Sequence, residues 1–445
     1  MIHRDTSNSD RRARSGSTYG VIGAGASGLT VVKNFLEHGI KVECLEREDD
    51  VGGNWYYGKP ASSICRSTHL ISSKLLTQYP DFPMPEDWPE YPSHAQSLEY
   101  LRSYAQKFDV CTHIQFNTSV ARVEPADSDA TRWRVTLSDG QVREYRGIVI
   151  ANGHHWDPIW PDYPGQFTGT ILHSSQYKTP DVLAGKRVLV IGAGNSGCDI
   201  AVESAQFAAA TFHSLRRGYH FVPKFIRGKP ADRCGEFMLR WHVPLWLRRR
   251  IAARLIHTAL GWPQEFGLPA PDHKLFETHP IVNSQLLYFI GHGRIKPKPD
   301  VAQLCGHEVR FTDGTAEPID LIVHATGFRI SIPFVDPSHL NWKNGKPQLF
   351  LNAFHPRYDN LFIAGLVQSD SGLWPLVHYQ AQLMARFIRA QRENPRLAGK
   401  FRRLKSRADS DLSRSIRYLP TPRHLLEVEH FGYRKRLKEL CSQFE

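Results

Sequence analysis

The chain has 445 residues, of which 41% are hydrophobic, 11% aromatic and 22% charged, and this composition is typical of a globular protein with more than one domain. No stretch reaches the roughly 18 consecutive apolar residues of a membrane-spanning helix, so no transmembrane anchor is expected. The formal net charge of +12 favours an anionic partner, which is a nucleic acid, a membrane surface or an anionic cofactor.

The N-terminus and the cysteines indicate where the protein works. Residues 1–18 are polar and rich in Arg and Ser, without the apolar core of a secretory signal, and they predict a disordered tail. The seven cysteines are scattered and form no Cys-x-x-Cys pair. This spacing argues against a disulfide framework, a metal site or a redox dithiol, and it favours a cytoplasmic location.

Clusters of basic residues are interspersed with apolar residues at helical spacing. They lie in residues 248–250, 402–407 and 434–438, outside any recognisable nucleic-acid module, so no nucleic-acid partner is expected. Residues 240–263 are basic and amphipathic and contain Trp241, Trp246 and Trp262. Two interpretations of this segment stay open: a helix that covers the second domain or the active-site entrance, and a peripheral contact with a membrane. A homodimer is also left open.

A nucleotide-binding motif follows the first predicted strand, residues 19–22. The run GAGASG has glycines at the spacing of a dinucleotide loop and is followed by a helical pattern that ends at Gly39. The first glycine allows a tight turn, the second lets a pyrophosphate approach the backbone, and the third packs the helix on the strand. The predicted binding residues of this loop are Gly23, Gly25, Ala26, Ser27 and Gly28.

The same motif recurs in the middle of the chain as VIGAGNSGC, again between a predicted strand and a predicted helix. A repeated strand, glycine loop and helix indicates two dinucleotide-binding units. The predicted binding residues of the second loop are Gly192, Gly194, Asn195, Ser196 and Gly197.

The two units differ at the end of their second strand. Glu46 stands there in the first unit, where a carboxylate can accept hydrogen bonds from both ribose hydroxyls of an adenosine. Arg216 and Arg217 stand there in the second unit, where guanidinium groups can pair with a 2′-phosphate that a carboxylate would repel. The second unit is therefore predicted to bind NADPH rather than NADH. A basic pair on the surface is the alternative interpretation.

Each unit is followed by a hairpin and a buried strand that ends at a glycine. The first hairpin turns at Asp139-Gly140 and leads to Gly153, and the second turns at Asp313-Gly314 and leads to Gly327. Residues 361–390 then read as a strand, a glycine-rich turn and a long helix that return the chain to the first unit. The expected fold class is α/β, with two Rossmann-like domains and the second inserted into the first.

The predicted boundaries follow from this pattern. Residues 19–172 form the first part of the FAD-binding domain, residues 173–329 form the NADP-binding domain with a helical insert at about 236–290, and residues 330–445 form the second part of the FAD-binding domain with C-terminal helices.

From about Tyr19 to Ala390 the chain resembles a flavin-containing monooxygenase of the class B flavoprotein family. The resemblance rests on both glycine loops, on GGNW at residues 52–55, on ATGF at residues 325–328 and on FTGTILHSSQYK at residues 167–178. The last run matches the family fingerprint FxGxxxHxxxY through Phe167, Gly169, His173 and Tyr177. The resemblance implies that these runs add cofactor-binding residues: Gly53, Asn54, Trp55, His173, Tyr177, Thr326 and Gly327.

The family resemblance also implies an activity. NADPH reduces FAD, O2 adds to the reduced flavin as a hydroperoxide, and one oxygen atom is transferred to a small organic substrate with a nucleophilic nitrogen or sulfur. The protein excludes water and positions hydrogen bonds, so no catalytic nucleophile and no metal is expected. His173 and Tyr177 are expected to organise the linker between the domains and the NADP pocket, with a purely structural His173 as the alternative.

One position departs from the family pattern. Relatives commonly have an Asn beside the flavin before an Asp-Phe-Pro run, whereas this chain has Ile71 there, followed by Ser72 and Ser73. An isoleucine side chain forms no hydrogen bond. Two outcomes stay open: Ser72, Ser73 or His69 supplies the polar contact, or the protein releases peroxide as an uncoupled NADPH oxidase.

Several alternatives remain at this stage. Baeyer–Villiger relatives usually have a Trp followed by Pro or Asp at the last fingerprint position, where this chain has Tyr177-Lys178, so heteroatom oxygenation is favoured over ketone oxygenation or oxidative decarboxylation. A flavin disulfide reductase needs a cysteine pair that the sequence lacks. A non-enzymatic nucleotide sensor is a third class. Trp55 and Trp374 are expected either to wall the flavin or substrate cavity or to fill a core.

Overall fold

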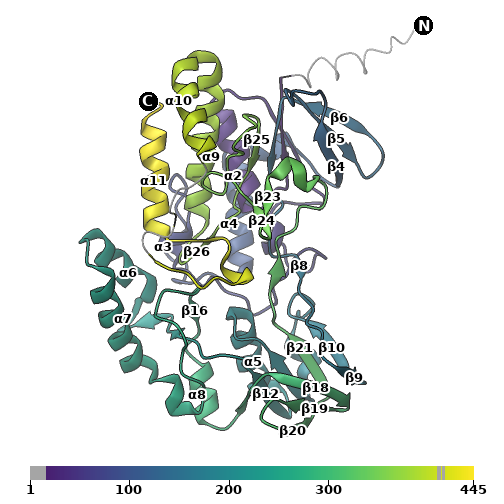
Figure 1. Ribbon diagram of the computed structural model, residues 1–445, viewed down its shortest axis with the longest axis vertical. Helices are drawn as coiled ribbons and strands as arrows, with labels where there is room; N and C mark the ends of the chain where they lie inside the picture. Colours follow the sequence, from purple (N-terminus) through teal and green to yellow (C-terminus); the bar gives the residue numbers. More distant parts are fainter. Residues whose placement is uncertain (1–16, 408–411, 413–415) are drawn as a thin grey trace.

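The computed structural model describes residues 17–407, 412 and 416–445, so the predicted tail of residues 1–18 lies almost entirely outside the described residues. Two α/β halves are stacked along the long axis of the molecule, with α9 to α11 in the upper half and α5 to α8 in the lower half of Figure 1.

The upper half is built on a five-stranded parallel sheet. Its strands, in spatial order, are β25 (Leu361–Ile363), β7 (Gly147–Ile150), β1 (Tyr19–Ile22), β2 (Val42–Leu45) and β3 (Ile114–Gln115). All residues of β1, β7 and β25 are buried, as expected for a parallel sheet with both faces covered. The helices of this half are α2 (Ala26–Glu37), α3 (Lys74–Thr77), α4 (His94–Lys107), α9 (Trp374–Glu393), α10 (Pro395–Ser406) and α11 (His430–Ser442).

The lower half repeats the same sheet. Its strands, in spatial order, are β10 (Thr170–His173), β21 (Leu321–His324), β11 (Arg187–Ile191), β12 (Ala210–Ser214) and β17 (Ile295–Lys298), again all parallel. The helices of this half are α5 (Asn195–Phe207), α6 (Ala231–Arg240), α7 (Leu245–Leu260) and α8 (Leu286–Gly291).

Both predicted hairpins are present as antiparallel sheets. The first sheet consists of β4 (Val120–Pro125), β5 (Trp133–Leu137) and β6 (Val142–Tyr145). The second consists of β18 (Val301–Gly306), β19 (Glu308–Phe311) and β20 (Ala316–Pro318), with β9 (Gly165–Phe167) pairing parallel to β18. Short paired strands complete the molecule: β8 (Asp157–Pro158) with β22 (Phe328–Arg329), β13 (Phe221–Val222) with β16 (Ile281–Val282), β14 (Phe225–Ile226) with β15 (Lys229–Pro230), β23 (Trp342–Lys343) with β24 (Lys346–Pro347), and β26 (Gln368–Ser369) with β27 (Glu427–Val428).

The order of the strands shows that the lower half is inserted into the upper half. β25 follows the whole lower sheet in the sequence, yet it pairs with β7 of the upper sheet. The chain therefore leaves the first sheet after β7 and returns to it after completing the second sheet. This confirms the α/β fold with two Rossmann-like units, one within the other.

The structure corrects the predicted boundary at residue 173. β10 ends at His173 but forms the edge of the lower sheet by pairing with β21, and β9 also pairs in the lower half. The lower half thus begins before residue 173, because the fingerprint segment supplies an edge strand that the sequence pattern did not reveal. The helices between β12 and β17 extend from Ala231 to Gly291, close to the helical insert predicted at about 236–290, with short strands before and between them.

Trp374 belongs to the core of the upper half. Its side chain is 4% exposed and stacks on the rings of Tyr79 and Tyr100, with centroids 5.8 and 5.5 Å away. Trp55 is half-buried and meets Trp374 edge to face at 6.0 Å. Of the two interpretations of Trp374, the structure thus supports the filled core.

Candidate functional site

The first glycine loop brings three segments into contact that leave no room for side chains. A Cβ atom on Gly23, whose φ is +103°, would lie 2.7 Å from the carbonyl oxygen of Ala151 at the end of β7. A Cβ atom on Gly28 would lie 1.8 Å from the carbonyl oxygen of Gly23. The helix α2 begins at Ala26 without a side-chain cap, so its first backbone N–H groups are available to an anion.

The predicted flavin-side residues surround this loop. Gly53 crosses it, with its Cα atom 3.5 Å from the position of a Gly25 Cβ. The Ser27 hydroxyl faces Gly365, beyond β25, and the Asn54 side chain accepts hydrogen bonds from the Ser63 N–H and hydroxyl at 2.7 and 2.8 Å. Asn54 therefore holds the loop that follows it.

Glu46 lies where the sequence placed it, at the end of β2 beside the loop. Its carboxylate accepts hydrogen bonds from the N–H groups of Ala24 at 2.5 Å and Glu48 at 2.9 Å. Burial raises the pKa of this carboxyl, and the two N–H donors oppose that rise. A carboxylate at this edge can accept hydrogen bonds from ribose hydroxyls.

The second glycine loop has the same geometry. A Cβ atom on Gly192 would lie 2.4 Å from the carbonyl oxygen of Ala325 after β21, and one on Gly197 would lie 2.0 Å from the carbonyl oxygen of Gly192. The helix α5 begins at Asn195 without a side-chain cap and with no acidic residue in its first turn. The Asn195 side chain accepts a hydrogen bond from the Val282 N–H at 2.7 Å, while Ser196 is exposed. Asn195 thus attaches the helical insert to the loop.

The two arginines after β12 differ in their contacts. Arg217 forms an ion pair with Asp272, 3.1 Å away. Arg216 is exposed and has no ion-pair partner among the described residues. Of the pair, Arg216 is therefore the guanidinium that is free to bind a phosphate.

His173 and Tyr177 are held by hydrogen bonds within the protein, which fits the expectation that they organise the linker between the domains, and their direct contact with a cofactor stays a prediction. Both are 0% exposed. The His173 Nδ1 atom accepts a hydrogen bond from the Ser175 N–H at 3.1 Å, and Nε2 lies 3.2 Å from the carbonyl oxygen of Gly327. The Tyr177 hydroxyl donates to Glu203 on α5 at 2.5 Å. These hydrogen bonds tie the fingerprint segment to β21 and α5.

Thr326 and Gly327 follow β21 and are both partly exposed. The Thr326 hydroxyl donates to the carbonyl oxygen of Ile159 at 2.6 Å, which joins this turn to the segment after β8. Their direct contact with a cofactor stays a prediction.

The segment around Ile71 exposes fewer polar side chains than the sequence suggested. Ser72 is 9% exposed and its hydroxyl lies 2.7 Å from that of Thr77, and Ser73 is 0% exposed. Asp232 from α6 accepts a hydrogen bond from the Ser73 N–H at 2.7 Å. Of the three polar candidates in this segment, only His69 is exposed. The expectation that Ser72 or Ser73 supplies the polar contact is therefore not supported by their orientation.

Asp199 on α5 is a residue that sequence reasoning missed. Asp199 is exposed, but many protein atoms lie around its carboxyl group. The resulting desolvation raises the pKa of this carboxyl to about 6. The nearby Lys224 and a hydrogen bond from the Asn283 side chain at 2.7 Å oppose the rise. An acid in the middle of a helical pattern normally faces solvent, so only the fold reveals the neighbouring Lys224 and Asn283.

Other chemistry finds little support in the described residues. No group of three or more His, Cys, Asp or Glu side chains in residues 17–407, 412 and 416–445 is arranged to hold a metal ion. The seven cysteines are all unpaired. A disulfide reductase would need two of them together beside the first loop.

Comparison with known proteins identifies the family. The model of the family "Flavin-binding monooxygenase-like" matches residues 17–418. The chain is 32% identical over 448 residues to flavin-containing monooxygenase 5 of Mus musculus, covering 95% of this chain and 82% of that protein. It is 35% identical over 389 residues to dimethylaniline monooxygenase (N-oxide-forming) 2 of Macaca mulatta, covering 83% of this chain and 72% of that protein.

A solved structure has the same fold. Cyclohexanone monooxygenase from Rhodococcus sp. Phi1, bound to NADP+, superposes with a TM-score of 0.68 at 20% identity and covers 96% of this chain and 98% of that one. Within the described residues, no helix is long and apolar enough to cross a membrane.

The second loop yields a direct test. Gly197→Ala would place a methyl group 2.0 Å from the Gly192 carbonyl oxygen and must spread the loop, so affinity for NADP+ is expected to fall by about tenfold or more. Gly399→Ala in α10 is the matched control, because no atom lies within 4 Å of its new methyl group. Isothermal titration calorimetry on both variants measures the effect. Unchanged NADP+ affinity in Gly197→Ala would contradict a nucleotide site at this loop.

Proposed function

The chain belongs to the flavin-binding monooxygenase-like family, and from this premise we propose that it binds FAD at the first glycine loop and NADPH at the second, and transfers one atom of O2 to a nucleophilic nitrogen or sulfur of a small organic substrate. The observation that carries the proposal is the pair of equivalent glycine loops, each at the carboxyl edge of its own parallel sheet and each opening an uncapped helix. The family's enzymes bind FAD and NADP(H), so the expectation of a flavin-dependent monooxygenase is confirmed at the level of the family.

The proposed FAD site uses the first loop and the segment that crosses it. The backbone N–H groups of Gly25, Ala26 and Ser27 at the start of α2 hold the pyrophosphate, and Gly23 and Gly28 allow its close approach. Glu46 accepts the ribose hydroxyls. Gly53, Asn54 and Trp55 line the path toward the flavin ring, and Trp55 is half-buried.

The proposed NADPH site uses the second loop in the same way. Gly192 and Gly197 shape the turn, and Gly194, Asn195 and Ser196 present backbone N–H groups at the start of α5. Arg216, which has no ion-pair partner among the described residues, binds the 2′-phosphate, and Arg217 stands beside it in an ion pair with Asp272. Bound FAD and NADPH supply the redox chemistry, while the chain positions them, excludes water and lets a substrate approach.

The nitrogen or sulfur substrate class has support from two sides. The macaque relative, 35% identical to this chain, carries N-oxide formation in its name. The fingerprint ends in Tyr177 rather than in the tryptophan usual for Baeyer–Villiger enzymes. The Tyr177 hydroxyl donates a hydrogen bond to Glu203. The likeness to cyclohexanone monooxygenase, at 20% identity, supports the fold and not the reaction.

A substrate panel tests the class. The FAD-loaded protein is incubated with NADPH, O2 and, in turn, a thioether, a tertiary amine, a ketone and a 2-oxo acid, and the products are identified by mass spectrometry. We expect the sulfoxide and the N-oxide, each with one added oxygen atom. An ester from the ketone as the sole oxygenated product, or NADPH consumption with peroxide and no product, would contradict the proposal.

Arg216→Ala tests the nucleotide specificity. Removing the guanidinium is expected to lower NADPH affinity by roughly 1.5 to 3 kcal/mol and to change NADH affinity little, because only NADPH carries the 2′-phosphate. The rate of anaerobic flavin reduction against nucleotide concentration gives both affinities. An equal loss for both nucleotides would mean that Arg216 does not bind the 2′-phosphate.

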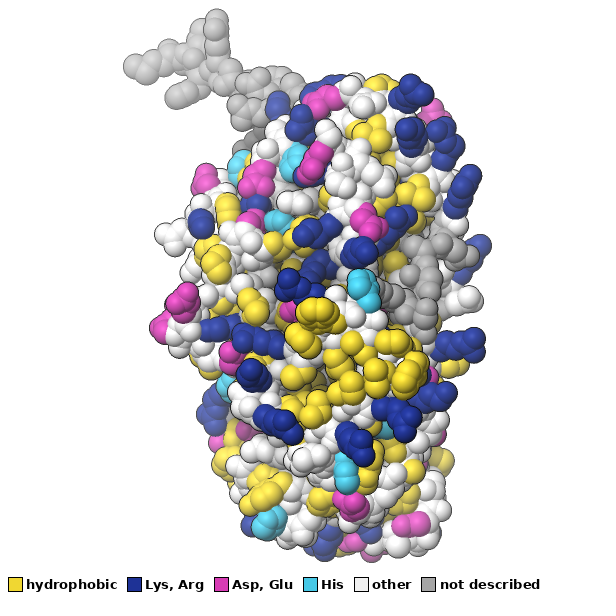
Figure 2. Space-filling view, turned by 90° about the vertical axis from the view of Figure 1, so that its left-hand side faces the viewer, with side chains coloured by type: hydrophobic (Ala, Val, Ile, Leu, Met, Phe, Trp, Pro, Cys, Tyr) yellow, Lys and Arg dark blue, Asp and Glu magenta, His cyan; other side chains and the backbone are white. Residues whose placement is uncertain are grey.

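We also propose that this protein is cytoplasmic and that it contacts an anionic membrane surface through α6 and α7. The unpaired cysteines support the location. Figure 2 shows hydrophobic side chains gathered on the face that carries these helices, with Lys and Arg side chains around them. The most exposed apolar residues of the two helices and their flanks are Phe237 at 64%, Trp241 at 69% and Trp246 at 61%.

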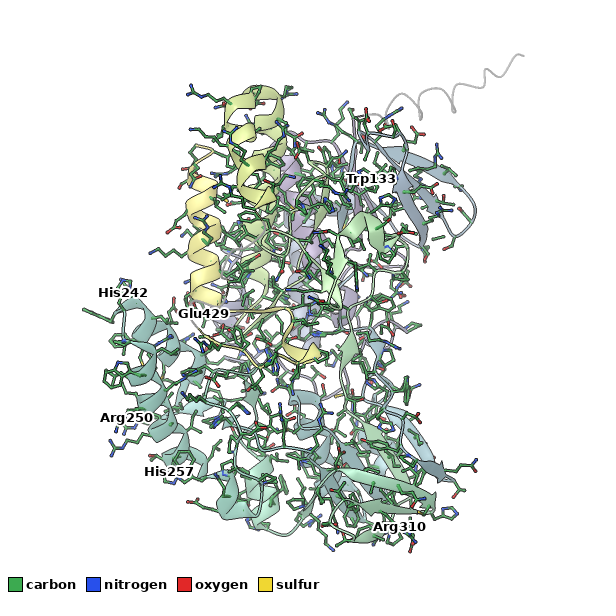
Figure 3. All side chains as sticks on the ribbon, in the orientation of Figure 1. Trp133, His242, Arg250, His257, Arg310 and Glu429 are labelled. Carbon is green, nitrogen blue, oxygen red and sulfur yellow. The ribbon has the colours of Figure 1, made fainter. Side chains whose placement is uncertain are left out.

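The charges around this surface fit anionic lipid. Arg240, Arg250 and Arg254 are exposed and have no ion-pair partner among the described residues. Arg250 lies on the outer side of α7 in Figure 3. Tryptophans flanked by arginines on one face of a helix favour the boundary between lipid headgroups and acyl chains, and each basic residue near an anionic surface adds to the attraction.

Co-sedimentation with lipid vesicles tests this contact. The protein is expected to bind vesicles that contain phosphatidylglycerol more tightly than pure phosphatidylcholine vesicles, and Trp241→Ser/Trp246→Ser is expected to bind them about tenfold or more weakly. Phe207→Ser is the control, since it removes an apolar side chain that is 50% exposed elsewhere. Equal binding by the double variant and the unaltered protein would contradict the proposal.

A further inference from the structure

The segment of residues 416–429, which precedes α11, lies between the upper half and the lower half. In Figure 1 it is the yellow stretch that precedes α11 and runs between the two halves, and in Figure 3 Glu429 marks its end. The Leu419 N–H donates to the carbonyl oxygen of Glu277 at 2.9 Å, and Glu427 lies 3.2 Å from His279. On the other side, Lys346 donates to the carbonyl oxygen of Leu425 at 2.7 Å. Both halves thus hold residues 419–427 in place.

This segment carries Arg423 over the second glycine loop. The Nη2 atom of Arg423 lies 3.5 Å from the position of a Gly194 Cβ, and Cζ and Nη1 lie 3.9 Å from it. Gly194 is the N-cap of α5 and the middle glycine of the motif, the one whose lack of a side chain lets a pyrophosphate approach. At the first loop the equivalent Gly25 faces the backbone of Gly53 instead. The two loops therefore have the same backbone geometry, but the Gly53 backbone lies over the first loop and the Arg423 side chain lies over the second.

The charges at the N-terminus of α5 favour the binding of an anion there. The N-terminus of α5 carries a partial positive charge, and its first turn has no acidic residue. Arg423 has no ion-pair partner among the described residues, whereas its neighbours Arg217 and His279 have Asp272 and Glu427. A guanidinium held against the positive end of a helix is unfavourable unless a negative group lies between them.

The neighbouring His424 is buried beside several basic residues. Its pKa is lowered to about 4, first by burial and then by the charges of Arg423, His279, His273 and Arg217. Asp272 contacts both Arg217 and His273, at 3.1 and 2.8 Å, and Glu427 lies 3.2 Å from His279. Of the two arginines that act on His424, Arg423 is the one without an ion-pair partner among the described residues.

We propose that Arg423 binds the pyrophosphate of the dinucleotide at the second glycine loop, so that the C-terminal segment forms a wall of the NADPH site. This rests on the proposed function, because it requires a dinucleotide at that loop. The guanidinium can form paired hydrogen bonds with phosphate oxygens from the side opposite the α5 N–H groups. Nucleotide binding would then fix the C-terminal segment against the lower half.

The proposed role differs from that of Arg216 in a measurable way. NADPH and NADH share the pyrophosphate, so Arg423→Ala is expected to weaken both by a similar factor, about tenfold to a hundredfold. Arg423→Lys is expected to lose less, since it keeps the charge but not the planar fork. Arg417→Ala is the matched control: it removes the same charge from an exposed position of the same segment.

The measurement is the rate of anaerobic flavin reduction against nucleotide concentration, on FAD-loaded protein. A second readout is the proteolysis of residues 416–429, which NADP+ should slow in the unaltered protein and in Arg417→Ala but not in Arg423→Ala. Normal NADPH affinity and normal NADP+ protection in Arg423→Ala would overturn the inference, as would a loss confined to NADPH. If the unaltered protein binds neither nucleotide, the proposed function fails as well. Equal losses in Arg423→Ala and Arg423→Lys with lowered FAD content would show a structural role and also overturn it.

Discussion

The contact between the first glycine of each loop and the end of the neighbouring strand is the constraint on which the site depends. Gly23 lies against Ala151 and Gly192 lies against Ala325, each so closely that no Cβ atom fits. This contact fixes the strand, turn and helix at an angle that directs the uncapped start of α2 or α5 toward the crevice beside the strand order reversal. Backbone groups can therefore bind a phosphate at both loops, while side chains select the nucleotide and, at the second loop, the proposed Arg423 contact adds to the backbone groups.

The insertion of one unit into the other explains how the two nucleotide-binding crevices keep a fixed position relative to each other. The chain passes between the halves at the fingerprint segment, after β21 and again before α11. At the first crossing, His173 and Tyr177 form hydrogen bonds with the end of β21 and with α5. At the second crossing, Thr326 donates a hydrogen bond to the segment after β8. The hydrogen bonds of these side chains, of which His173 and Tyr177 are buried, hold the halves in one arrangement. Transfer of a hydride between two bound dinucleotides needs such a fixed arrangement.

Sequence reasoning succeeded where the pattern is local. The glycine loops, the acid at residue 46, the arginines at 216 and 217 and the two hairpins follow from spacing within some 30 residues, and the repeat of one pattern revealed the inserted topology. It failed where partners are distant. Nothing near His173 shows that β10 is an edge strand, and nothing near Ser72 or Ser73 shows that Thr77 and the insert bury them. Arg423 is a lone arginine in a loop, and only the return of the chain over Gly194 gives it a role.

We propose that FAD and NADPH bind in the two crevices so that NADPH reduces FAD and the reduced flavin then reacts with O2 to oxygenate a substrate. Stopped-flow absorbance tests it most directly: the FAD-loaded protein is reduced with NADPH without oxygen and then mixed with oxygenated buffer. The account predicts bleaching of the flavin by NADPH, followed by a transient species in the near ultraviolet before oxidised flavin returns. Failure of NADPH to bleach the flavin, or immediate return of oxidised flavin with an equivalent of peroxide, would contradict it.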